Sequence, residues 1–325
     1  MIAPTPSAGG QNMQTVTLSI FRFTTPEKRL WVFSQMVANK LGMHYMPKAK
    51  FWKMLGSGTG EGFTPKPNWN VWGMIGVWED EETARREVAE SPIYKKWAEI
   101  ADESYTVLLN PINGRGKWDN SMPFDVTKPG KPGEVDPDDV RPIAALTRAT
   151  LNFWKIERFW SYEPPISHMI GKDANVVFKI GMGEIPFSQQ MTFSVWPDSE
   201  SMVKFAYGSG AHAEAIKKGY EEGWFKEALF ARFKIAGTIG KWEGKDPVGD
   251  ALKQFKRAEA PKPAPAAVAP KPAPAVEAPK PAPAMATAAP AAEAPKPAPA
   301  PVASKPVQHN SYKGKPGKGG RKENA

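Results

Sequence analysis

The stretch MIGVWEDEETARREVAESPIYKKWAEI at residues 74–100 is answered by MTFSVWPDSESMVKFAYGSGAHAEAIKK at residues 191–218. Three pairs of identical residues lie 118 positions apart: Trp78 and Trp196, Asp80 and Asp198, Ser91 and Ser209. A shared tryptophan, acid and serine in one register are unlikely to recur by chance. We therefore interpret the chain as containing an internal duplication.

Earlier segments repeat as well, at a slightly different spacing. FRFT at residues 21–24 matches TRAT at residues 147–150, and WKM at residues 52–54 matches FKI at residues 178–180. These pairs lie 126 positions apart, eight more than the later pairs. The difference falls in the loop at residues 56–69, GSGTGEGFTPKPNW, which is longer in the first copy.

Each copy has the pattern strand, helix, strand, strand, helix, strand. In the first copy the strands are expected at 15–23, 49–55, 70–78 and 105–111, with helices after Thr25 and over 80–101. In the second copy the strands are expected at 142–151, 175–183, 189–196 and 227–240, with helices over 152–163 and 198–223. This order is that of the ferredoxin-like split βαββαβ unit. We predict an α+β fold of tandem ferredoxin-like repeats that form a dimeric-α/β-barrel-type fold.

The domain boundaries follow from this pattern and from composition. We predict a disordered N-terminus at 1–12, a first repeat at 13–118, a linker at 119–140, a second repeat at 141–257 and a disordered tail at 258–325. The tail repeats EAPKPAPA and contains no Leu, Ile, Phe or Trp, so it cannot bury enough apolar surface to offset its chain entropy.

Charge and composition exclude several classes of protein. The chain of 325 residues has no cysteine, which excludes disulfides, thiolate metal sites and a cysteine nucleophile. Its net charge is +9, but residues 258–325 carry ten Lys or Arg against four Glu, so the folded part is nearly balanced. We therefore expect no binding of nucleic acid.

One histidine of the second copy is the leading candidate for chemistry. His212 follows an expected helix break at Gly208-Ser209-Gly210, where Ser209 is a suitable N-cap, so it lies in the first turn of a new helix. The positive end of the helix dipole favours the neutral imidazole, which is the form that binds metals.

The helical face that carries His212 contains small residues. Ala215 and Gly219 lie one and two turns on, whereas the same face of the first copy holds Trp97 and Ala101. We expect the first copy to be filled and the second to be hollow beside His212. A packed, structural role for this histidine stays open alongside that of a ligand.

Other candidates have simpler explanations. His168 and His44 are expected near helix ends and are alternative ligands to His212. Arg22 and Arg148 recur on the first strand of each copy and are candidate catalytic residues, although salt bridges explain them equally well. GSGTGEG at residues 56–62 lacks the glycine spacing of a dinucleotide-binding loop, so we expect a hairpin loop there.

Several long segments resemble the spheroidene monooxygenase family, the acyclic carotenoid 2-ketolases of purple phototrophic bacteria. They are residues 40–69, RPIAALTRAT at 141–150, FKIGMGEIPFSQQMTFSVWPD at 178–198 and residues 221–247. The resemblance spans roughly Gln14 to Val248, and the tail lies outside it.

That resemblance implies a haem protein that uses O2 and reduced ferredoxin. Such an enzyme oxidises C-2 of spheroidene and related acyclic carotenoids twice, and the resulting geminal diol loses water to give a ketone. It implies haem b with His212 as the axial iron ligand, and Ala215 and Gly219 beside the cofactor. A substrate that resides in the bilayer implies a cytoplasmic protein in peripheral contact with the inner or photosynthetic membrane. Homo-oligomerisation stays open.

Two rival functions are compatible with the predicted barrel. The first is a cofactor-free monooxygenase of the antibiotic-biosynthesis type, which would be colourless and would use His212 as an acid, a base or a structural residue. The second is a barrel that binds a carotenoid or lipid without catalysis, which would show carotenoid colour but no haem absorption.

Overall fold

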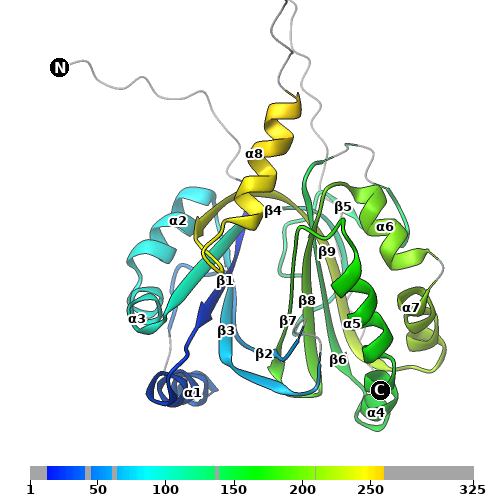
Figure 1. Ribbon diagram of the computed structural model, residues 1–325, viewed down its shortest axis with the longest axis horizontal. Coiled ribbons are helices and arrows are strands. Elements are labelled where there is room, and N and C mark those ends of the chain that lie inside the picture. The colour runs from blue at the N-terminus through cyan, green and yellow to red at the C-terminus, as the bar shows by residue number, and fades with distance from the viewer. Residues whose placement is uncertain are drawn as a thin grey trace, which may run out of the picture. The chain divides into compact units, whose positions relative to one another are not determined.

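Two halves with the same order of elements form this protein (Figure 1). The computed structural model describes residues 13–40, 45–60, 64–135, 138, 140–208 and 210–259. The first half contains β1 (Thr15–Arg22), α1 (Pro26–Lys40), β2 (Phe51–Gly58), β3 (Pro67–Trp78), α2 (Glu81–Glu90), α3 (Pro92–Ile100) and β4 (Glu103–Gly116). The second half contains β6 (Ile143–Leu151), the 3-10 turn η1 (Phe153–Lys155), α4 (Ile156–Ser161), α5 (Glu163–Lys172), β7 (Phe178–Ile185), β8 (Gln189–Trp196), α6 (Ser199–Tyr207), α7 (Ala211–Glu221) and β9 (Phe225–Gly240).

Eight of the strands close into an antiparallel barrel. Their order is β1-β3-β2-β7-β8-β6-β9-β4, and β4 pairs again with β1. The halves join through β4–β9 and through a short β2–β7 contact, in which Gly56 pairs with Gly183. This confirms a mixed α+β architecture with a barrel, while the description of the halves as tandem ferredoxin-like repeats stays a prediction.

The strands alternate between two environments, as the period of a β-strand requires. In β1, Val16, Leu18 and Ile20 join the core cluster that fills the barrel, whereas Phe21 joins a second cluster beneath the helices. Figure 1 shows α1 to α3 against the outside of one half and α4 to α7 against the outside of the other. The barrel thus has an outer layer of helices on two sides.

The residues that revealed the duplication have equivalent roles. Asp80 accepts a hydrogen bond from Thr83 N at the start of α2, and Asp198 accepts one from Ser201 N at the start of α6. Trp78 and Trp196 are both buried. The expected break in the second helical region is present, since α6 gives way to α7 after Tyr207, and α2 gives way to α3 at Ser91 in the same way. Ser209, the expected N-cap, lies outside the described residues, and the N-cap position of α7 is Gly210.

Other expectations need correction. The predicted linker contributes to the fold: Phe124 is buried against Phe233, and β5 (Lys128–Pro129) pairs with β4. The connection after α4 contains a further helix, α5, and the chain continues past β9 into α8 (Pro247–Glu259), whose Val248 joins the barrel core. The predicted disordered N-terminus and all but the first two residues of the predicted tail lie outside the described residues.

Candidate functional site

An apolar cavity of about 490 Å³ lies on the outer face of the second half, between the sheet and the helices. Strands β6, β8 and β9 form its floor, and helices α4 to α7 form its walls. Its lining is dominated by apolar and aromatic side chains, including Trp196, Phe205, Ile216, Trp224, Phe225 and Phe230. Cavities of this size and character commonly hold cofactors or small ligands.

The matching space in the first half is filled by aromatic side chains. Trp97 of α3 is buried and contacts Phe21, Phe23 and Trp31 in edge-to-face arrangements, with ring centroids 5.3 to 6.1 Å apart. At the duplication spacing, Ala215 stands where the first half has Trp97, and Ala215 lines the cavity. The absence of an indole at this position contributes to the room in the second half.

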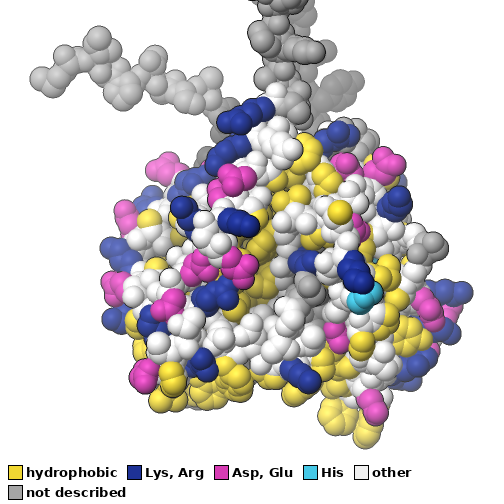
Figure 2. Space-filling model, viewed as in Figure 1, with side chains coloured by type: hydrophobic (Ala, Val, Ile, Leu, Met, Phe, Trp, Pro, Cys, Tyr) yellow, Lys and Arg dark blue, Asp and Glu magenta, His cyan; other side chains and the backbone are white. Residues whose placement is uncertain are grey.

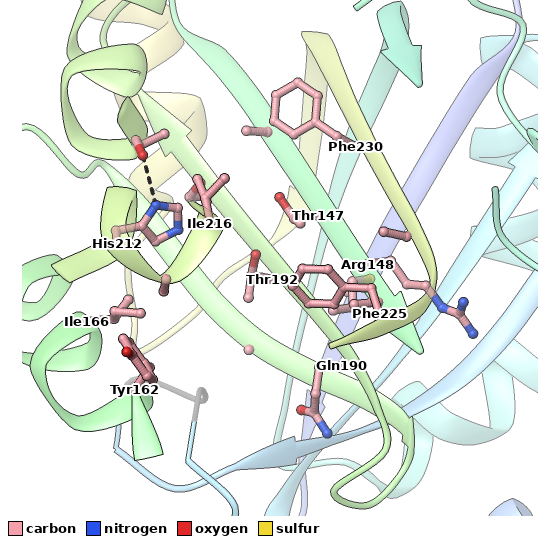
Figure 3. Close-up of a pocket in the computed structure, with 18 of the residues that line it drawn as sticks. Thr147, Arg148, Tyr162, Ile166, Gln190, Thr192, His212, Ile216, Phe225 and Phe230 are labelled. Atoms are coloured by element: carbon pink, nitrogen blue, oxygen red, sulfur yellow. Dashed lines mark hydrogen bonds between the residues drawn. The ribbon is translucent and has the colours of Figure 1, made fainter. Parts of the chain in front are cut away.

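His212 enters the cavity from the first turn of α7. It stands at the position that corresponds to Tyr94, and it is half-buried beside Phe205, with ring centroids 5.1 Å apart. Its Nδ1 lies 3.1 Å from the carbonyl oxygen of Ala206 (Figure 3). A carbonyl oxygen only accepts hydrogen bonds, so Nδ1 carries the proton and donates it. The unprotonated Nε2 faces the cavity.

The break between α6 and α7 makes this contact available. Ala206 belongs to the last turn of α6, where carbonyl groups have no partner further along the helix. A Cβ atom on Gly208 would collide with the backbone carbonyl of Lys204, so the turn at this residue favours glycine. The chain then re-enters a helix at Ala211, which brings His212 back over the end of α6.

Burial lowers the pKa of His212, and the hydrogen bond to Ala206 opposes this effect without cancelling it. The apolar surroundings disfavour a charged imidazolium. The ring is therefore neutral near pH 7, with the tautomer fixed by the backbone.

Polar groups face His212 from the sheet. Thr147 and Thr192 come from the outer faces of β6 and β8, and Gln190 lies further along β8 (Figure 3). The residues that line the cavity thus include the unprotonated Nε2 of His212 on the helical side and hydroxyl and amide groups on the sheet side.

Arg115, from the end of β4, also lines the cavity and was missed by sequence reasoning. Its Nη2 donates to the hydroxyl of Tyr207 at 3.1 Å, and its guanidinium lies 4.6 Å from the centroid of the Phe230 ring. Its Nη1 is buried and has no hydrogen-bond partner among the described residues. Arg115 belongs to the first half but serves the cavity of the second, so the comparison of the two copies gave no signal for it.

The other predicted site residues lie elsewhere. Gly219 is not among the residues that line the cavity. The ring of Phe225 packs against it so closely that a Cβ atom there would lie 2.5 Å from the ring. His168 lies within α5 rather than near a helix end, and its side chain is exposed. His44 lies outside the described residues.

The two candidate arginines form ion pairs. Arg22 pairs with Glu103 and Glu243 and stacks on Trp242. Arg148 contributes to the cavity wall, but its guanidinium is directed away from the cavity (Figure 3) and pairs with Glu184 and Glu227. The salt-bridge explanation of both residues is the one that the geometry supports.

Among the described residues, no group of three or more His, Asp or Glu side chains is arranged to hold a metal ion. Within the same part of the chain, none of the helices has the length and apolarity that a bilayer crossing requires.

Comparison with known proteins identifies the family. No protein-family model matches the chain. A spheroidene monooxygenase from Cereibacter sphaeroides is 69% identical over 255 residues, which cover 78% of this chain and 76% of that protein. The chain belongs to the spheroidene monooxygenase family. The family member from Rhodobacter capsulatus is 44% identical, over 76% of this chain and all of that protein, and the one from Rubrivivax gelatinosus is 31% identical, over 74% and 89%.

Solved structures with a similar arrangement are more distant. An aldoxime dehydratase in complex with butyraldoxime has a TM-score of 0.48 at 10% identity, and covers 75% of this chain and 87% of that chain. A monooxygenase-type protein from Fusobacterium nucleatum has a TM-score of 0.30 at 8% identity, and covers 71% of this chain and 96% of that chain.

Proposed function

We propose that this protein is a haem-dependent monooxygenase that oxidises C-2 of an acyclic carotenoid such as spheroidene, with O2 and electrons from reduced ferredoxin. The names of its relatives support the substrate class and the type of reaction. The proposal of a haem cofactor rests on His212. The backbone contact fixes its tautomer, so that its Nε2 is unprotonated and available in an apolar cavity.

The residues present fit a haem group in three ways. A neutral imidazole held through the opposite nitrogen is the usual form of an axial histidine ligand. The cavity has a volume of about 490 Å³, and Ala215 leaves open the place that an indole fills in the other half. The unpartnered Nη1 of Arg115 suits a carboxylate, and haem b carries two propionate groups.

Bound haem supplies the activation of O2, and the surrounding residues control access and protons. The aromatic and aliphatic walls exclude water from the reacting carbon and suit a long polyene. Thr147, Thr192 and Gln190 are positioned to hold a water molecule or to donate a proton on the side opposite His212.

The proposed reaction balances without further reagents. Each hydroxylation replaces one C–H bond at C-2 by C–OH, consumes one O2, two electrons and two protons, and releases one water molecule. A second hydroxylation at the same carbon gives a geminal diol, which loses water to form the ketone. Reduced ferredoxin is the proposed source of the electrons.

Turnover of the purified full chain tests this proposal. With haem, spheroidene dispersed in detergent, reduced ferredoxin and 18O2, we expect a hydroxylated product that carries one labelled oxygen, followed by the ketone. Omission of haem, ferredoxin or O2 should each stop product formation. Turnover by colourless protein would instead support a cofactor-free monooxygenase, and bound carotenoid without any turnover would support a binding protein.

A further inference from the structure

Exposed aromatic side chains gather at the end of the second half where the cavity opens. Phe153 and Trp154, in η1, are 72% and 85% exposed. Phe187, in the turn between β7 and β8, is 48% exposed, and the Nε1 atom of Trp160 donates to its backbone carbonyl. Solvent exposure of so many large apolar side chains in one region marks an interaction surface.

This surface is continuous with the cavity. Asn152, which precedes η1, donates its backbone N–H to the carbonyl of Trp224, whose side chain lines the cavity. Tyr220 lines the cavity as well and is 67% exposed, so the cavity reaches the surface beside it. Aromatic side chains are therefore found both on the exposed rim and in the adjoining cavity wall.

A second exposed patch lies at the same edge of the molecule. It consists of Leu30, Phe33 and Val37 on α1 together with Trp69, and the rings of Phe33 and Trp69 lie 5.9 Å apart. Figure 1 places α1 and α4 at the lower edge, and Figure 2 shows apolar side chains along that edge beneath both. Both patches thus face the same edge of the molecule in this view.

We propose that this edge docks onto the surface of a lipid bilayer, with Phe153 and Trp154 inserted among the headgroups and the cavity mouth turned toward the hydrocarbon. The inference rests on the proposed function, since a hydrocarbon substrate reaches an apolar cavity most directly from the bilayer. Tryptophan and phenylalanine at the boundary of acyl chains and water are typical of proteins that lie on membranes.

The charges near the aromatic rim indicate how this surface binds. Lys155 and Arg158 are matched by Glu157 and Glu222, and Arg158 pairs with Glu222, so these residues carry no excess of positive charge. We therefore expect docking to depend on apolar insertion and to persist at high ionic strength. The basic tail, by contrast, is expected to need anionic lipid and low salt.

Co-sedimentation of the full chain with vesicles of pure phosphatidylcholine, at high salt, tests the docking surface. The zwitterionic lipid and the salt remove any contribution of the basic tail. We expect the parent to bind, the double variant Phe153→Ser with Trp154→Ser to bind at least roughly tenfold more weakly, and Leu30→Ser to bind several-fold more weakly. Val135→Ser, an exposed apolar position in the connection after β5, is the matched control and should bind like the parent.

Each outcome separates docking from catalysis. Phe153 and Trp154 do not line the cavity, so the double variant should oxidise detergent-dispersed carotenoid at the parental rate. The docking proposal would be overturned if the parent did not bind these vesicles, or if the double variant bound them as tightly as the parent. Neither result would affect the proposed activity. A parental dimer that becomes monomeric in the double variant, without vesicle binding, would assign the surface to a second copy of the chain.

Discussion

The Nδ1 atom of His212 lies 3.1 Å from the carbonyl oxygen of Ala206, and this contact fixes the tautomer of the only described histidine that lines the cavity. The same backbone contact also holds the ring in place, so no side chain is needed to orient it. A carbonyl acceptor adds less negative charge than a carboxylate would, so the proposed axial ligand is a neutral and moderately basic imidazole.

The lowered pKa of His212 gives a first prediction about stability without haem. Between its folded-state pKa and the unfolded value of about 6.5, the unfolded chain binds a proton that the folded chain does not. The free energy of unfolding should therefore fall as the pH drops below about 6.5, and His212→Leu should lack this part of the slope. Urea unfolding of both proteins across this range measures the difference, and identical slopes would contradict it.

Arg115 gives a second prediction at this scale. If its free Nη1 pairs with a propionate, Arg115→Gln should weaken haem binding by about tenfold or more, as the loss of a partly buried, charge-assisted hydrogen bond requires. Arg22→Gln removes an arginine whose ion pairs lie away from the cavity and is the matched control. Equal haem affinity in both variants would exclude the propionate contact.

At the scale of elements, α3 and α7 occupy corresponding places in the order of the two halves but pack differently. The first packs Trp97 into a dense aromatic cluster, and the second leaves space with Ala215 and turns His212 into it. The difference between a tryptophan and an alanine at corresponding positions thus distinguishes a densely packed half from a half that contains a cavity.

Exchanging these residues is the third prediction. Ala215→Trp should fill the cavity, abolish haem binding and leave the protein folded, because the space is open. Trp97→Ala should instead destabilise the protein by about 3–5 kcal/mol and leave haem binding unchanged in the folded fraction. Calorimetry and haem titration measure both effects. Normal haem binding by Ala215→Trp would place the cofactor elsewhere.

How much the sequence predicted differs from element to element. The repeated Asp80 and Asp198 were recognisable as a pair in the sequence, and the structure shows that both cap helices. The break before α7 was recognisable because glycine acts within a few residues. Helix α5 begins at Glu163, where the predicted helix over 152–163 ends, and Pro164 and Pro165 lie in its first turn, where proline is favoured. Helix α8 has no counterpart in the first copy, so the comparison of copies did not reveal it.

The difference between local and long-range contacts also explains which site residues the sequence could predict. His212 and Ala215 were found because both belong to one helical face and have a contrasting partner in the first copy. Gly219 was misplaced because Phe225, six residues later, folds back against it. Arg115 reaches the cavity through pairing of β4 with β9, a contact between residues more than 100 positions apart, which a local pattern cannot show.

At the scale of the whole molecule, buried side chains fill the interior of the barrel. Arg148, Glu184 and Glu227 form a buried charged network, and Trp118 lies against the same arginine. Ligand chemistry is therefore expected on the outer face of the second half, where the sheet forms the floor of the cavity and the helices form its walls. The exposed aromatic rim beside that face is the surface that we propose docks onto a bilayer.

The absorption spectrum of the full chain purified with haem supply, beside His212→Ala, tests the central claim most directly. We expect a Soret band in the parent that is lost or shifted in His212→Ala, and that returns toward the parental position when imidazole is added, because free imidazole can replace the deleted side chain as a ligand. A Soret band that is the same in both proteins and indifferent to imidazole would contradict the assignment of His212 as the axial ligand.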